Sequence, residues 1–199
     1  ASVGEEPACW LGHSFGGLLT QIVAGRGHAA AAVAISPAPF RGVLPLPFAA
    51  LKSSNPVLSN PANRHRAVLL TPEQFRYGFG SAVSEEESDR LYEEFHVAGS
   101  GATVFQAATA NLNPWTEVKV DTNPDRGPLL IIGSKADHTA PAAIAKASFR
   151  KQERNAGVTE YHEYEERGHS LIVDHGWKDV ADLALAFAQR VAPPEQVAG

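Results

Sequence analysis

The stretch Cys9-Trp10-Leu11-Gly12-His13-Ser14-Phe15-Gly16-Gly17 decides the fold, because it joins a short apolar run to a serine that stands between glycines. Its pattern, G-x-S-x-G, is typical of a serine held on a strained turn between a strand and a helix. We expect Gly12 and Gly16 to remove Cβ atoms that would clash in this turn. An apolar strand precedes the turn, and helical spacing runs from Phe15 to a stop at Gly25. The stretch therefore predicts a strand, a nucleophile elbow and a helix.

Size and composition bound the class of protein. The chain has 199 residues, of which 44% are hydrophobic, so it can bury the core of one domain. The net charge of -5 and the absence of a Lys/Arg cluster argue against a nucleic-acid partner. No apolar run approaches the roughly 20 residues that span a bilayer, and no signal-peptide pattern is seen, so we expect a soluble, cytoplasmic protein. The single cysteine, Cys9, is expected to be a buried free thiol.

Strands and helices alternate outside the middle of the chain. Apolar runs predict strands, and amphipathic spacing predicts helices between them. The expected strands cover residues 29–35, 129–132 and 158–164, and the expected helices cover residues 141–155 and 177–191. This alternation predicts an α/β fold with a mostly parallel sheet and flanking helices. Active groups should therefore gather at the carboxyl ends of the strands.

The middle of the chain reads as an insertion. We expect residues 1–36 and 127–199 to form the core and residues 37–126 to form a cap or lid. The first part of this insertion, residues 40–63, is apolar but rich in proline and shows no sustained period, so we expect it to be irregular.

Three helices are expected later in the insertion. Thr71-Pro72-Glu73-Gln74 and Ser84-Glu85-Glu86-Glu87 each have the pattern of a capping box. The acidic residues of the second box are explained by the helix dipole. A third helical piece is expected from Val104 to Leu112.

Three polar residues follow three of the expected strands. Ser14 follows the first, Asp137 lies just beyond 129–132, and His169 lies just beyond 158–164. A serine hydroxyl needs a neighbouring imidazole to take its proton, which indicates a role for His169 as base. Asp137 would accept the other ring N–H and stabilise the imidazolium. The order Ser, Asp, His is that of an acyl-transfer triad.

Other side chains offer rival pairings. His138 adjoins the expected acid, and Ser170, Asp174 and His175 adjoin the expected base, although their positions are less favourable. His13, inside the elbow, is expected to pack or hydrogen-bond beside the pocket. No H-E-x-x-H or paired-cysteine spacing occurs, so we expect neither a metal nor a cofactor.

Three motifs together resemble the α/β-hydrolase superfamily: Gly12-His13-Ser14-Phe15-Gly16-Gly17, Gly133-Ser134-Lys135-Ala136-Asp137-His138 and Gly168-His169. The resemblance implies a serine esterase or lipase that acts on small or medium acyl esters through an acyl-enzyme on Ser14. It further implies that the Phe15 N–H holds the oxyanion and that His169 activates the deacylating water. A perhydrolase, a lactonase or an acyltransferase would use the same triad.

The chain departs from the superfamily before the elbow. Members usually carry further strands there, and a loop that donates a second oxyanion N–H. Residues Ala1 to Pro7 cannot supply these parts. We therefore expect association, either as a homo-oligomer or with a missing N-terminal segment. The competing hypothesis is a non-catalytic binding or scaffold protein that keeps the triad without a complete pocket.

Overall fold

The computed structural model describes residues 8–122 and 126–191, so Ala1 to Pro7 lie outside the described residues. Its main sheet has four parallel strands in the order β1-β2-β5-β6. These strands are β1 (Ala8–His13), β2 (Ala29–Ile35), β5 (Leu129–Ser134) and β6 (Thr159–Tyr164). The helices that flank the sheet are α1 (Phe15–Gly25), α6 (Ala142–Gln152) and α7 (Trp177–Val191). The α/β prediction, with its parallel sheet, is confirmed.

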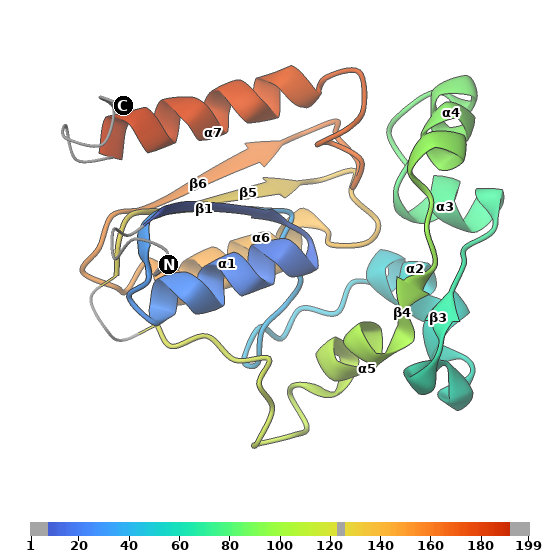
Figure 1. Ribbon diagram of the computed structural model, residues 1–199, viewed down its shortest axis with the longest axis horizontal. Coiled ribbons are helices and arrows are strands. Elements are labelled where there is room, and N and C mark those ends of the chain that lie inside the picture. Colours follow the sequence, from blue (N-terminus) through green and yellow to red (C-terminus); the bar gives the residue numbers. More distant parts are fainter. Residues whose placement is uncertain (1–7, 123–125, 192–199) are drawn as a thin grey trace, which may run out of the picture.

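Alternation along the central strands divides the core into two layers. In β2, Ala31, Val33 and Ile35 pack with α7 on one face of the sheet. The alternate residues Ala32 and Ala34 pack with α1 and α6 on the other face. Successive side chains of a strand point to opposite faces, so an unbroken apolar strand is buried by helices on both sides. Figure 1 shows α7 on one side of the sheet and α1 with α6 on the other.

Strand β1 forms an edge of the sheet. Within the described part of the chain it pairs only with β2. Trp10 and Leu11, which are neighbours and point to opposite faces, are 44% and 58% exposed. Cys9 is a free thiol and is exposed, so the expectation of a buried thiol was wrong. The cause is the position of the strand, because an edge strand has fewer neighbours to cover it.

Seven short elements lie between β2 and β5 in the part of this segment that the structure describes. They are α2 (Phe48–Leu58), the 3₁₀ helix η1 (Pro61–His65), β3 (Ala67–Val68), α3 (Pro72–Gly78), α4 (Glu85–Phe95), β4 (Gly99–Ser100) and α5 (Gly101–Thr109). Helices α2, α3 and α4 lie beyond the carboxyl ends of the parallel strands (Figure 1). Strands β3 and β4 form a separate antiparallel pair. This group of elements therefore stands at the end of the sheet where active groups were expected.

Helix α2 corrects the expectation that residues 40–63 are irregular. Pro56 lies inside this helix, near its end, where the lost N–H removes one hydrogen bond late in the helix. Ala50 is buried in a cluster that includes Leu18 of α1 and Phe40. Tertiary packing thus stabilises a helix whose own sequence favours it weakly. Helix α5 begins at Gly101, three residues before its expected start.

The two expected capping boxes have different outcomes. At α3 the Thr71 side chain accepts from the Gln74 N–H and the Gln74 side chain accepts from the Thr71 N–H, so the box is complete. At α4 the Ser84 hydroxyl accepts from the Glu87 N–H. The Glu87 carboxylate, however, accepts from the N–H and from Nδ1 of His175, at 2.7 and 2.8 Å. The acidic start of α4 therefore also ties this helix to the chain beyond β6.

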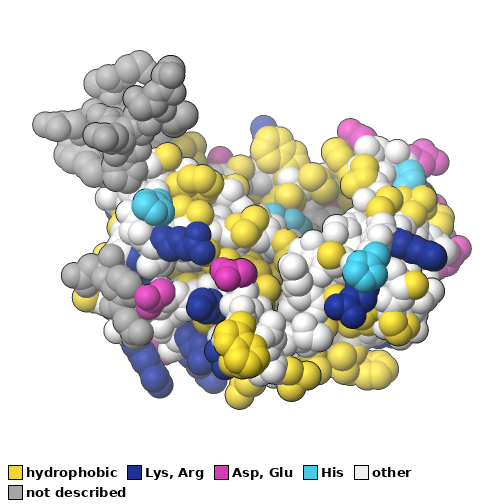
Figure 2. Space-filling view, turned by 60° about the horizontal axis from the view of Figure 1, so that its bottom comes forward, with side chains coloured by type: hydrophobic (Ala, Val, Ile, Leu, Met, Phe, Trp, Pro, Cys, Tyr) yellow, Lys and Arg dark blue, Asp and Glu magenta, His cyan; other side chains and the backbone are white. Residues whose placement is uncertain are grey.

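Several large apolar side chains of the segment between β2 and β5 remain uncovered. Leu44, Leu46 and Phe48 are between 67% and 79% exposed, and Leu112 and Trp115 are each 84% exposed. Figure 2 shows hydrophobic side chains spread among charged ones over one face of the molecule. The segment between β2 and β5 therefore has apolar side chains on its solvent-exposed side as well as on the side that packs against α1.

Candidate active site

Ser14 stands at the junction of β1 and α1. Its backbone has φ 55° and ψ -119°, a conformation that non-glycine residues rarely adopt. Its N–H donates to the Ile35 carbonyl at 3.0 Å, and its own carbonyl accepts from the N–H groups of Leu18 and Ala38, at 3.1 and 2.9 Å. These three hydrogen bonds hold Ser14 to helix α1 and to the end of strand β2 with the residues that follow it. The surroundings therefore maintain the strained conformation of the serine.

The glycines around Ser14 differ in how closely they are packed. A Cβ atom at Gly12 would overlap the Gly16 carbonyl and lie 2.6 Å from Thr20 Oγ1. A Cβ atom at Gly17 would lie 3.1 Å from both the Gly12 carbonyl and Pro37. At Gly16 it would meet nothing within 4 Å. The expectation of a clash is therefore confirmed at Gly12 and wrong at Gly16, where the missing Cβ would point into open space.

His169 and Asp137 form a buried pair. The Nδ1 of His169 lies 2.7 Å from Oδ2 of Asp137, and both side chains are fully buried. The other carboxylate oxygen, Oδ1, accepts from the N–H groups of Thr139 and Ala140, at 2.7 and 2.8 Å. Burial raises the pKa of Asp137, but the charge of His169 and these hydrogen bonds outweigh it and hold the pKa below its ordinary value. An ionised Asp137 accepts the proton of Nδ1 and leaves Nε2 of His169 as the basic nitrogen.

The Nε2 atom of His169 is buried and has no hydrogen-bond partner among the described residues. It therefore makes no hydrogen bond with the Ser14 hydroxyl in this structure. Such bonds are often long in unliganded enzymes and tighten when substrate binds.

His13 packs against His169. The two ring centroids are 4.4 Å apart, with the planes tilted by 44°. Because His13 directly precedes Ser14, this contact brings the His169 side chain to the nucleophile turn. Burial, followed by the charge of His169, lowers the pKa of His13 to about 3. His13 is thus a neutral ring near pH 7, and its packing on His169 agrees with the expectation that it packs or hydrogen-bonds rather than reacts.

The rival side chains are engaged elsewhere. Asp174 is buried and pairs with the guanidinium of Arg167, and the Ser170 hydroxyl donates to the same carboxylate at 3.5 Å. The Nδ1 of His138 donates to the Tyr77 carbonyl at 2.9 Å. His175 is tied to α4, as described above. None of these alternative side chains forms a hydrogen bond with the His169 side chain, whereas Asp137, the expected acid, does.

The Phe15 N–H opens α1. The first N–H groups of a helix have no partner within it, and the Phe15 N–H has none within the part of the chain that the structure describes. It is therefore a donor without a partner among the described residues, in the residue that directly follows Ser14.

In residues 8–122 and 126–191, no three His, Cys, Asp or Glu side chains are grouped so as to hold a metal ion, and no helix is long and apolar enough to cross a membrane. A cavity of about 560 Å³ lies beside the end of α1, lined by residues that include Ile22, Arg26 and Lys119. None of its lining residues belongs to the Ser14, Asp137 and His169 group.

Comparison with known proteins places this architecture. A family model described as the alpha/beta hydrolase family matches residues 1–183. The chain belongs to the alpha/beta hydrolase family. No curated protein matches this hydrolase closely enough to count as a relative. The family assignment agrees with the strand–elbow–helix geometry and with the Ser, Asp, His order.

Solved structures show the same fold at low identity. A monoacylglycerol lipase from Paleococcus ferrophilus is 18% identical, with a TM-score of 0.55, and the match covers 94% of this hydrolase and 68% of the lipase. Polyneuridine aldehyde esterase is 16% identical, with a TM-score of 0.56, covering 94% and 74%. An acylaminoacyl peptidase from Pyrococcus horikoshii is 13% identical, with a TM-score of 0.50, covering 95% and 25%. This hydrolase thus spans about two thirds of the lipase and a quarter of the peptidase.

Proposed function

We propose that the chain is a serine carboxylester hydrolase that acts on small or medium acyl esters. The observation that carries the proposal is the buried pair of His169 and Asp137, 2.7 Å apart, held beside a serine with positive φ at a strand–helix junction. The lipase and esterase names of the structural neighbours agree with it. No cofactor is needed for this chemistry.

The reaction follows from the position of each group. The Ser14 hydroxyl attacks the ester carbonyl carbon while Nε2 of His169 takes its proton. Asp137 stabilises the imidazolium, and the Phe15 N–H donates to the oxyanion. The leaving alkoxide takes the proton from His169 as the carbon–oxygen bond breaks. Water then attacks the acyl-enzyme with His169 again as base, which releases the acid and restores Ser14.

The elements between β2 and β5 would form the cap in this proposal. Helices α2, α3 and α4 stand beyond the strand ends (Figure 1), and the segment that leads into and begins α2 carries the exposed apolar side chains Leu44, Leu46 and Phe48, which offer apolar surface to an acyl chain. We keep residues 37–126 as the cap and residues 1–36 with 127–199 as the core. We also keep association through β1 as part of the proposal, because its outer edge, which has no partner among the described residues, lies next to the elbow.

Hydrolysis of p-nitrophenyl butyrate tests the proposal. The parent protein should release p-nitrophenol, and Ser14→Ala should lower kcat by about 10⁵- to 10⁶-fold, because the triad acts as a unit. Leu185→Ala, on an exposed side chain of α7 outside the proposed cap, is the matched control and should retain the parent rate. Equal activity in the parent and in Ser14→Ala would exclude the proposed mechanism.

The non-catalytic alternative rests on the unpartnered Nε2 of His169, which leaves Ser14 without an activating hydrogen bond in this structure. A fluorophosphonate probe separates the two hypotheses. Labelling of Ser14 in folded protein, lost in Ser14→Ala, supports a competent nucleophile. Folded protein that is never labelled supports a binding or scaffold role. A perhydrolase, lactonase or acyltransferase would be labelled too, and would be separated by comparing peroxide, lactone and alcohol substrates.

A further inference from the structure

One short segment of the insertion touches both loops that carry the acid and the base. This segment, Tyr77–Ser81, comprises the end of α3 and the turn that follows. It makes four hydrogen bonds with these loops. Three join the acid loop: His138 Nδ1 donates to the Tyr77 carbonyl at 2.9 Å, Thr139 Oγ1 donates to the Gly78 carbonyl at 2.9 Å, and Ser81 Oγ donates to the Ala136 carbonyl at 2.6 Å. The fourth joins the base loop, where the Ser170 N–H donates to the Phe79 carbonyl at 3.1 Å. Two of the bonded residues flank Asp137 and one follows His169.

The approach between this segment and the base loop is close. A Cβ atom added at Gly168, next to His169, would lie 2.9 Å from Ser81 Oγ and 3.1 Å from the Phe79 carbonyl. Contacts under about 3.0 Å are not tolerated without movement. The glycine of the Gly168-His169 motif is therefore explained by the passage of Tyr77–Ser81 over the base loop.

Phe79 adds a side-chain contact. Its ring meets the imidazole of His169 edge-on, with centroids 4.9 Å apart and an interplanar angle of 76°. Edge-to-face packing of this kind has a preferred geometry and contributes beyond the area buried. His169 thus has three lateral supports: the Asp137 carboxylate at Nδ1, the His13 ring at 4.4 Å and the Phe79 ring.

We propose that Phe79 is a positioning residue for His169. Its ring holds the imidazole plane so that Nε2 meets the Ser14 hydroxyl, while its carbonyl holds the adjacent Ser170. The expected effect on kcat rests on the proposed function. The expected effect on the orientation of the His169 ring does not. Nothing in the sequence pattern around Phe79 indicated this role, because the contact joins residues 90 positions apart.

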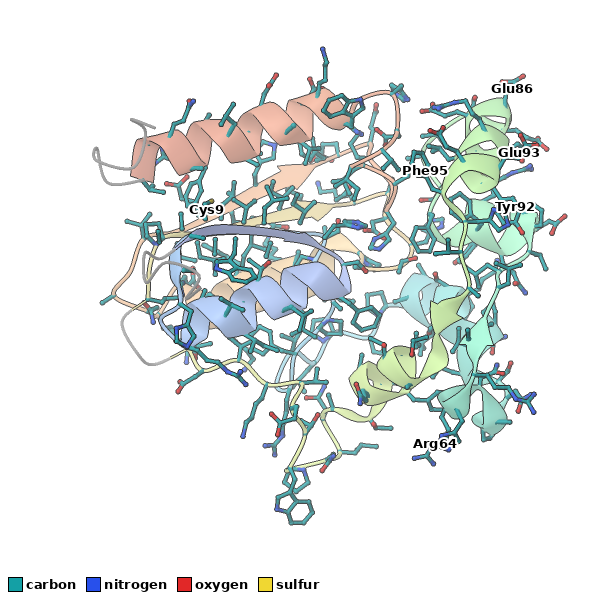
Figure 3. The ribbon with its side chains drawn as sticks, in the orientation of Figure 1. Cys9, Arg64, Glu86, Tyr92, Glu93 and Phe95 are labelled. Carbon is teal, nitrogen blue, oxygen red and sulfur yellow. The ribbon has the colours of Figure 1, made fainter. Side chains whose placement is uncertain are left out.

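Misplacement of a catalytic group by about 1 Å can cost roughly 100-fold in rate. We therefore expect Phe79→Leu, which keeps an apolar side chain but removes the ring, to lower kcat by about 10- to 100-fold, with KM changed by less than about 3-fold. Phe79→Tyr keeps the ring edge and should restore kcat to within about 3-fold of the parent. The matched control is Phe95→Leu on α4 (Figure 3), which removes a half-exposed ring that takes no part in the ring contacts of His169 with His13 and Phe79.

Each kcat is divided by the fraction of molecules that a fluorophosphonate probe titrates, so partial unfolding does not imitate the effect. A purely structural role would lower that fraction and leave kcat per labelled site unchanged, which would overturn the inference. Equal losses in Phe79→Leu and Phe79→Tyr would overturn it as well. If Phe79→Leu does not fold, Phe79→Met serves in its place.

A readout without turnover separates this inference from the proposed function. The proton shared by His169 Nδ1 and Asp137 gives a far-downfield proton resonance when it is shielded from solvent. We expect this resonance in the parent and in Phe95→Leu, and its broadening by faster exchange in Phe79→Leu. An unchanged resonance in Phe79→Leu would refute the positioning role. Failure of the parent to hydrolyse esters would refute only the proposed function.

Discussion

Ser14 concentrates the backbone strain of the elbow in a single residue. A conformation such as φ 55°, ψ -119° costs of order 1–3 kcal/mol and persists only where the surroundings determine it. The sequence pattern predicted this turn because the turn leaves no room for a Cβ atom at position 12, which the pattern fills with glycine. It could not separate Gly12 from Gly16, because the pattern records spacing and not the direction in which an added Cβ atom would point.

The two glycines give a matched pair of substitutions. Gly12→Ala forces a Cβ atom against the Gly16 carbonyl and Thr20, so we expect the free energy of unfolding to fall by about 2 kcal/mol or more. Gly16→Ala meets open space inside helix α1 and should raise the free energy of unfolding by about 0.5–1 kcal/mol. Urea denaturation of both variants measures the difference. Similar effects of the two substitutions would contradict the structure of the elbow.

Asp137 is expected to set the tautomer of His169. Asp137→Asn keeps the shape of the side chain, but its amide NH₂ can donate to His169 Nδ1, where the carboxylate accepts. The other tautomer of His169 is then favoured, so kcat should fall by about 10⁴-fold. The variant should still fold, as judged by circular dichroism. Parent-like activity of Asp137→Asn would require another carboxylate partner for His169, and Asp174 would then have to leave Arg167.

Asp137 should also shape the acid dependence of stability. Its pKa is lowered in the folded protein, so its contribution to the free energy of unfolding is present above about pH 4, the unfolded value, and is lost as pH falls through the lower folded value. The stability of the parent should therefore fall more steeply below about pH 4 than that of Asp137→Asn. Urea titrations between about pH 3 and pH 6 would measure both slopes. Parallel curves would mean that the pKa of Asp137 is not lowered.

At the scale of elements, regular apolar patterns in the sequence predicted the strands and helices well. Elements and side chains whose placement depends on tertiary contacts were not predicted. Strand β2 occupies its expected bounds, 29–35, because a buried apolar run between turns has one favourable solution. Helix α2 was missed because its stability comes from packing of Ala50 against the core rather than from its own sequence. The carboxylate of Glu87 was assigned to a capping box because its partner, His175, is 88 residues away.

The connection from β6 to α7 offers a test of one such tertiary contact. Asp174 is 1% exposed and pairs with Arg167, whose guanidinium also donates to the Leu171 and Gly176 carbonyls. Asp174→Ala leaves that cation without its partner, so we expect a loss of about 3 kcal/mol in the free energy of unfolding. Glu160→Ala removes the exposed ion pair with Arg190 and should change stability little. Equal effects in thermal denaturation would rule out a bracing role for Asp174.

At the scale of the whole molecule, we expect the edge strand β1 to govern assembly. Its outer side has no partner among the described residues, and Trp10 and Leu11 are exposed on it. Unpaired edges of this kind promote association, so we expect the protein to form dimers or larger assemblies. Leu11→Lys places a charge on the edge and should shift the distribution to monomer. Light scattering across a dilution series measures both, and a monodisperse parent monomer at all concentrations would contradict the prediction.

The bridge from Tyr77–Ser81 to the loops of Asp137 and His169 has a consequence for protein engineering. Insertions between core strands are attractive places to exchange substrate specificity, because whole segments can be transplanted between relatives. In this protein such a transplant would remove the contacts of Phe79 that we propose to position His169. A chimera that replaces residues 37–126 as one block should bind new substrates and turn them over poorly, whereas one that retains Tyr77–Ser81 should preserve the machinery while changing what it accepts.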